Sequence, residues 1–249
     1  MSIATEIQRL QTAKNDIKTA IENKGVTVGD GLIDTYAEKI NEISSGGGDN
    51  KFWDVYLKNG ERTYYLYAFS YEGWTDETFK PIHDMHPTNA DHMFFQTSIT
   101  DLKGILERQG VVLDTSKVPA MPQTFFNTQI THIPILDVSS CTNFGQAFRN
   151  SGKIVSIGLE NIRKDATWGY AFYFCSSLTD FYCTGTIGKS IEFPHCGLLS
   201  DESLQNIVDC LADLTGETTQ TLTLYKTVGE KLTDTQKATI TAKNWTLAY

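Results

Sequence analysis

The sequence predicts a mixed α+β fold in which a short helical (coiled-coil) module precedes a solenoid-like body of stacked repeats. Three patterns support this: heptad-spaced apolar residues near the start, a fixed period in the middle, and alternating helix and strand signals at the end. They predict a helical oligomerisation or docking module (1–44), a Gly-rich linker (45–50), an aromatic β-hairpin and capping region (51–110), an irregular repeat body (111–199) and a C-terminal αβαβ cap (200–249).

The first helix is predicted over residues 3–23, where apolar residues are spaced alternately by four and three positions. We expect this seam, which Lys14 interrupts, to mediate self-association; it consists of Ile3, Ile7, Leu10, Ile17 and Ile21. A second helix is expected from Asp30 to Ile43, so a two-helix hairpin closing on itself is the alternative. Small residues from Ser44 to Gly48 then predict the flexible linker.

Strand-like alternation begins after the linker. The runs 52–57 and 62–69 flank Lys58-Asn59-Gly60, and Asn-Gly between alternating runs predicts a β-hairpin. Aromatic rings on an exposed sheet face stack on sugars or anchor protein interfaces. We therefore predict that Tyr64, Tyr71 and Trp74 are exposed and bind a ligand. A short helix is expected from Leu102 to Gln109.

The repeat is clearest between residues 113 and 148, where LDTSKV and LDVSSC each lead to a matched pair of apolar residues. Their offsets are identical, because 136 − 113, 144 − 121 and 148 − 125 all give 23. A fixed period of matched apolar residues predicts copies that cover one another. Runs 94–99 and 171–178 echo the pattern, and Asp114 and Asp137 are expected to form the turns through hydrogen bonds to the backbone.

The C-terminal region predicts a helix–strand–helix–strand cap. Ser200 or Asp201 would cap a helix carrying Leu204 to Leu211, and residues 219–225 alternate as a strand. Thr233 would begin the next helix, and residues 245–249 would form the last strand.

Composition limits the classes of function. The 249 residues are 40% hydrophobic and 11% aromatic, which predicts a folded core. A net charge of −9 argues against nucleic acid or an anionic membrane as a partner. The N-terminal residues lack a secretion signal and no run is long enough to cross a membrane, so synthesis in the cytoplasm is expected. The five cysteines are expected to be reduced and mostly buried.

No pattern in the sequence supports catalysis, and no cofactor is expected. His83, His86 and His92, with Asp84 and Asp91, are rich in metal ligands but match no zinc spacing, so a polar surface loop is expected. His195 and Cys196 are adjacent and are interpreted as a surface histidine beside a buried thiol. GxSxG, HExxH and P-loop motifs do not occur.

The repeats LDTSKV and LDVSSC, each followed by a phenylalanine and an isoleucine-containing rung, resemble leucine-rich repeats of the BspA type. The N-terminal residues 3–26 and the segments 211–216, 219–224 and 245–248 are similar to the N- and C-terminal modules of tail proteins from phages of Gram-positive hosts. The repeats occur in bacterial surface proteins and phage tail proteins, but this sequence has few, irregular copies.

The resemblance implies a virion protein of the tail tip: a non-enzymatic tail fibre or receptor-binding protein that forms a homotrimer. Its expected partners are other tail or baseplate proteins, through the N-terminal helices, and a host-surface glycan or protein. The alternatives are a structural tail protein that binds only other virion proteins, and a bacterial surface adhesin, which would need export. A depolymerase would need convergent carboxylates in a groove.

Overall fold

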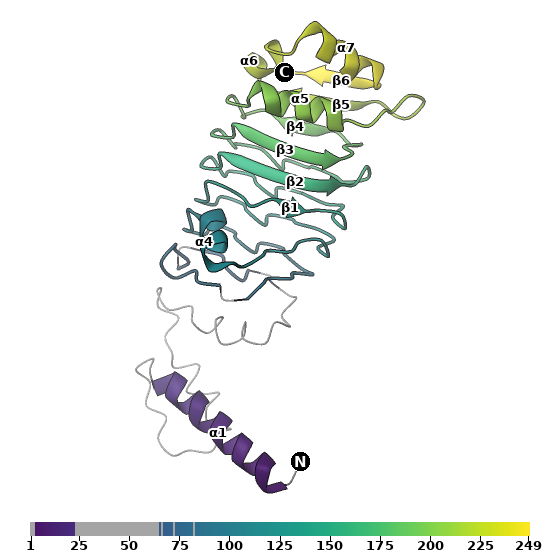
Figure 1. The fold of residues 1–249 in the computed structure, drawn as a ribbon. Coiled ribbons are helices and arrows are strands. Elements are labelled where there is room, and N and C mark those ends of the chain that lie inside the picture. Colours follow the sequence, from purple (N-terminus) through teal and green to yellow (C-terminus); the bar gives the residue numbers. More distant parts are fainter. Residues whose placement is uncertain (1–2, 23–64, 66, 72, 82) are drawn as a thin grey trace. The chain divides into compact units, whose positions relative to one another are not determined.

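The computed structural model describes residues 3–22, 65, 67–71, 73–81 and 83–249 (Figure 1). The chain divides into two compact units, 1–47 and 48–249. In the first, α1 (Ile3–Glu22) confirms the predicted first helix. On it, Ile21 is buried whereas Ile17 is 39% exposed. The side chains of Ile3, Ile7 and Leu10, and the predicted second helix, lie outside the described residues.

The second unit contains short helices and two three-stranded parallel sheets, which confirms the mixed α+β class. One sheet has the order β1-β2-β3 and the other β4-β5-β6. The strands are β1 (Leu136–Asp137), β2 (Ser156–Ile162), β3 (Asp180–Gly185), β4 (Ile191–Phe193), β5 (Gln220–Leu224) and β6 (Trp245–Ala248). The helices are α4 (Leu102–Gln109), α5 (Asp201–Cys210), α6 (Lys226–Glu230) and α7 (Asp234–Ala242). Within the described residues, no helix has the length and apolarity needed to span a bilayer.

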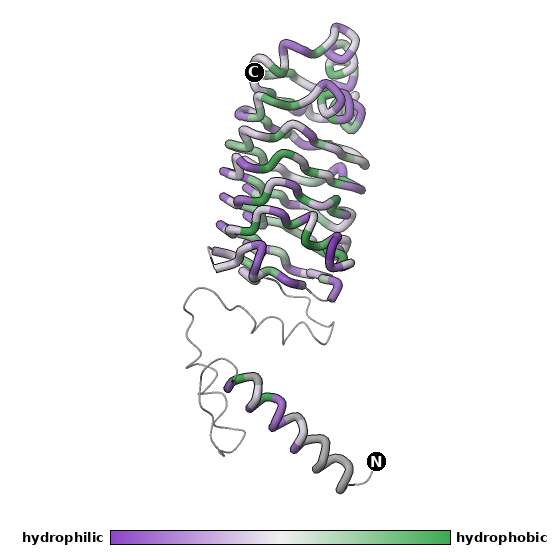
Figure 2. Tube along the Cα trace, turned by 60° about the vertical axis from the view of Figure 1, so that its left-hand side comes forward, coloured by the Kyte–Doolittle hydropathy of each residue, from purple (hydrophilic) through white to green (hydrophobic). Residues whose placement is uncertain are grey.

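Matched positions of the sequence repeat lie over one another. Leu136 pairs with Leu159 in parallel register, and Leu159 pairs in turn with Cys183. Outside the strands the parallel register continues, because the backbone N–H of Phe125 donates to the carbonyl of Ala147, the residue before Phe148, at 2.7 Å. We call each copy a coil. Apolar stretches recur from coil to coil in Figure 2, which agrees with the predicted covering of one copy by the next.

A column of buried phenylalanines runs through the second unit and forms the centre of its core. Neighbouring ring centroids are 4.6 to 5.5 Å apart, and the rings lie within 30° of parallel. The members, one from each coil, are Phe69, Phe94, Phe125, Phe148, Phe172 and Phe193. Because each coil contributes one ring, deleting any of the four interior rings removes contacts to two neighbours in the column.

A hydroxyl or thiol three residues after the stacked phenylalanine ties one coil to the next. Ser151 donates to the carbonyl of Phe125 at 2.5 Å, Cys175 to Phe148 at 3.0 Å and Cys196 to Phe172 at 3.6 Å. Each donor is fully buried and cannot reach water, so without this bond it would have no hydrogen-bond partner. This accounts for two of the five cysteines, all of which are free and buried, as predicted.

Most of the predicted β-hairpin, residues 52–64, lies outside the described residues. In the part that the structure describes, the prediction is wrong, because residues 67–69 form a turn and not a strand. This segment is instead a further coil: the N–H of Phe69 donates to Met93, and that of Tyr71 to Phe95, both at 2.8 Å. Alternating aromatics suggested a strand, but Ala68 and Phe69 are adjacent and both buried, which a strand with one exposed face does not allow. The pair Ala68-Phe69 matches Ala147-Phe148.

The C-terminal elements agree with the sequence. Ser200 caps α5 by accepting from the N–H of Ser203, and Thr233 caps α7 with a complete capping box. Strands β5 and β6 occur where alternation predicts them, and α4 has the predicted bounds. From residue 190 onwards, β4 and α6 were not predicted; they are only three and five residues long, too short to show a period.

Candidate functional site

The three predicted ligand residues have different outcomes. Tyr71 is 53% exposed, as predicted. The predicted exposure of Trp74 is wrong, because its side chain is 4% exposed and packs edge-on against Phe69 with centroids 5.1 Å apart. Tyr64 lies outside the described residues. Tyr71 is therefore the one described candidate whose ring can meet a ligand.

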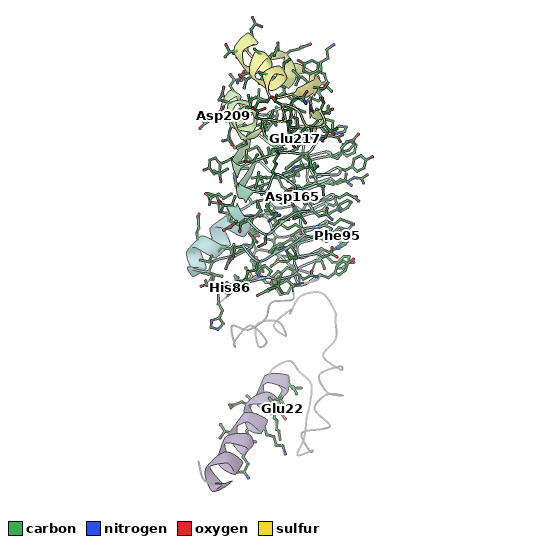
Figure 3. All side chains as sticks on the ribbon, turned by 90° about the vertical axis from the view of Figure 1, so that its right-hand side faces the viewer. Glu22, His86, Phe95, Asp165, Asp209 and Glu217 are labelled. Atoms are coloured by element: carbon green, nitrogen blue, oxygen red, sulfur yellow. The ribbon has the colours of Figure 1, made fainter. Side chains whose placement is uncertain are left out.

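Tyr71 belongs to a set of partly exposed aromatic rings that we call the aromatic edge. Its rings come from positions immediately around the stacked phenylalanine of each coil; Phe95 shows where they lie in Figure 3. A first cluster consists of Tyr67, Tyr71, His92, Phe95 and Phe126, and a second of Tyr170, Tyr173, Phe174 and His195. No spacing in the sequence groups these residues, because only the coils bring them together.

Several rings of the aromatic edge stand on backbone that L-residues rarely adopt. The φ angles of Tyr67, Tyr71, Tyr170 and Phe174 are +52°, +70°, +55° and +61°. The positions equivalent to Tyr71 and Phe174 in other coils hold Asn127 and Asn150, and asparagine tolerates this conformation best after glycine. The backbone conformation therefore belongs to the turn of each coil and does not require aromatic residues at these positions.

A groove of about 600 Å³ opens beside the first cluster. Its lining residues are Tyr71, Gln96, Thr97, Ser98, Asn127 and Gln129. Within the described part of the chain, the side-chain amides of Gln96, Asn127 and Gln129 make no hydrogen bond. Apart from the Tyr71 phenol, the groove has no ionisable lining residue. It therefore offers one aromatic face with free amide donors and acceptors.

The titratable residues singled out in the sequence do not meet in this groove. His86 lies 3.0 Å from Asp114, on a different side of the unit from Phe95 (Figure 3), and His92 pairs with Asp91. Across the residues that the structure describes, no three His, Cys, Asp or Glu side chains gather as a metal site would require.

The remaining candidates have structural roles. Burial raises the pKa of the Cys196 thiol well above its ordinary value, so this thiol is unsuited to nucleophilic attack. Hydrogen bonds from the side chain and backbone of Ser116 lower the pKa of Asp114 to about 2. The Asp137 carboxylate accepts from the N–H of Ser139 at 2.9 Å. Both aspartates form turns, as predicted, and neither faces a partner carboxylate in the groove.

A second hollow is charged rather than aromatic. It is lined by Arg163, Lys164, Asp165, Gly188, Lys189 and Glu217. Its charges are largely paired, since Arg163 forms a two-point ion pair with Asp165 at 2.9 Å and Lys164 reaches Glu217 at 2.5 Å. Unpaired amides and an exposed ring make the Tyr71 groove the better candidate site.

The groove amides were missed because single Asn and Gln residues form no motif. The signal that could have found them is the repeat itself: Gln96 and Asn127 both occupy the position two residues after a stacked phenylalanine, as Tyr71 does.

Comparison of the chain with family models, curated proteins and solved structures finds no match.

Proposed function

We propose that this protein is a non-enzymatic phage tail fibre or receptor-binding protein that attaches to a glycan on the host cell surface through the Tyr71 groove. In this proposal the coils form an irregular leucine-rich-repeat solenoid, the N-terminal helices join the chain to itself or to other tail proteins, and the protein acts at the tail tip of the virion.

The observation that carries the proposal is the combination of an exposed ring with free amides. One face of a pyranose ring is apolar and its rim carries hydroxyls, so it stacks on an aromatic face and exchanges hydrogen bonds with amides. Tyr71 supplies the face, and Gln96, Asn127 and Gln129 supply the polar partners. A concave site with a few convergent polar groups is typical of ligand binding.

The test uses an array of neutral bacterial cell-wall and capsular polysaccharides with the full-length protein and Tyr71→Asn. Asparagine occupies the same position in two other coils, so this variant should fold with equal or greater stability. We expect it to lose about tenfold or more in affinity for the bound polysaccharide, because the ring that stacks on the sugar is gone.

Tyr182→Thr is the matched control, because Tyr182 is 46% exposed but lies on strand β3, outside the aromatic edge. It should bind like the unaltered protein. Equal binding by Tyr71→Asn would remove the groove from the site. Absence of binding to every polysaccharide would favour the structural tail protein that touches no receptor.

A further inference from the structure

The aromatic edge extends well beyond the Tyr71 groove. One coil, which contributes Gln146, Arg149 and Asn150, separates the first cluster from the second. That coil is connected to the second cluster, because the Arg149 guanidinium lies 5.8 Å from the Tyr170 ring centroid. The same guanidinium donates to Gln146 at 2.8 Å, which fixes it on the edge. The edge is thus one continuous surface across six coils.

The spacing along this surface is regular. The coils repeat every 4.6 to 5.5 Å, as measured between the stacked rings. Four such steps separate the coil of Tyr71 from that of Tyr173, or about 20 Å at the usual strand spacing. A sugar residue in an extended polysaccharide advances the chain by a comparable length. A periodic surface of this kind matches a periodic polymer better than it matches a single sugar.

Rings occur at both ends of the edge, and their exposure is similar. Tyr170 is 55% exposed and Phe174 47%, against 53% for Tyr71. His195 stacks on Phe174 with centroids 4.0 Å apart, and its Nδ1 is buried without a hydrogen-bond partner among the described residues. The second cluster therefore shares its exposed ring faces with the first, whereas the buried Nδ1 of His195 is not available to a ligand.

We propose that the aromatic edge binds one linear, uncharged polysaccharide chain running along the coils, with the Tyr71 groove and the second cluster as two ends of one site. The inference rests on the proposed function and specifies its ligand class. An anionic polymer fits less well, because the groove has no cation. The net charge of −9 also opposes it.

The test measures affinity against ligand length by titration calorimetry with the full chain. The probes are oligomers of N-acetylglucosamine, glucose and rhamnose, each from the monosaccharide to the hexasaccharide. We compare the unaltered protein with Tyr71→Asn, Tyr170→Gln and the control Tyr182→Thr. Glutamine already stands at the positions in two other coils that correspond to Tyr170, namely Gln123 and Gln146, so Tyr170→Gln should fold.

We expect affinity to rise with length through the pentasaccharide, because four steps separate the coils of Tyr71 and Tyr173. Tyr170→Gln should weaken the hexasaccharide about tenfold and leave the disaccharide unchanged, whereas Tyr71→Asn should weaken every length. If affinity is constant beyond the disaccharide and Tyr170→Gln has no effect, the extended site is wrong while the groove and the proposed function survive, and the second cluster is then a surface for a protein. If no series binds at all, both proposals fail.

Discussion

At the scale of the residue, the phenylalanine column determines how tightly the coils are held. Phe148 is fully buried, with Phe125 5.5 Å away on one side and Phe172 5.4 Å away on the other. Phe148→Ala leaves a cavity between two rings that cannot close without shifting a whole coil. We expect a loss of about 3–5 kcal/mol in the free energy of unfolding, measured by urea denaturation.

The matched control for this cavity is Phe126→Ala, because Phe126 is half-buried and its ring stacks on that of Phe95 with centroids 5.1 Å apart. Its loss should be clearly smaller, since less area returns to water and no sealed cavity forms. Equal losses for the two variants would show that the column does not dominate the core.

Residue-scale prediction from sequence succeeded for Tyr71 and failed for Trp74, although the two are close in the chain and both are aromatic. Hydropathy does not separate them. Their exposure differs because the Trp74 ring packs edge-on against Phe69, and this contact depends on where the coil turns. The groove amides could not be predicted singly, because their significance lies in their positions relative to the stacked phenylalanines.

At the scale of the element, α7 tests how much of the C-terminal cap depends on local signals. Thr233 accepts from the N–H of Gln236 at 3.2 Å, and Gln236 accepts from the N–H of Thr233 at 2.8 Å. Thr233→Ala removes the first bond, and we expect it to cost about 1 kcal/mol of unfolding free energy in denaturant titrations.

Thr235→Ala, in the first turn of the same helix, separates capping from helix propensity. Alanine is the better helix former, so this variant should be neutral or slightly more stable. If Thr235→Ala destabilises as much as Thr233→Ala, the capping box is not the cause.

Helices were the elements best predicted, because their capping residues and apolar spacing are local features of the sequence. The bounds of α4 matched, and Ser200 and Thr233 began α5 and α7. The strands of the coils were harder: β1 has two residues and β4 three, too few for alternation to appear, and β2 buries the three consecutive residues Ile157 to Leu159. The hairpin prediction failed because alternating aromatics occur in a coil as well as in a strand.

At the scale of the whole molecule, the repeat period predicted stacking in the central coils, where identical offsets fixed the register. It missed the coil of Tyr65 to Tyr71, whose spacing to its neighbour differs from 23: Phe94 follows Phe69 by 25 residues, and Phe125 follows Phe94 by 31. Loops of different length between the coils obscure the period in the sequence, whereas the backbone hydrogen bonds between coils keep the stacked phenylalanines in register.

Assembly is the last prediction, and α1 is the element that tests it. Ile17 lies on the predicted seam and is 39% exposed, so a partner helix could cover it. We expect light scattering to give the mass of a trimer for the full chain and of a monomer for a version starting at Asn50. Ile17→Lys in the full chain should also give a monomer, because three lysines would meet at the seam.

Asn15→Lys is the control for added charge, since Asn15 is an exposed helical residue outside the seam. It should remain a trimer. A monomeric mass for the unaltered full chain would show that the seam does not join copies of this protein. The proposed function would then assign the helix to docking on a different protein, and avidity from three glycan sites would have no part in the proposed attachment.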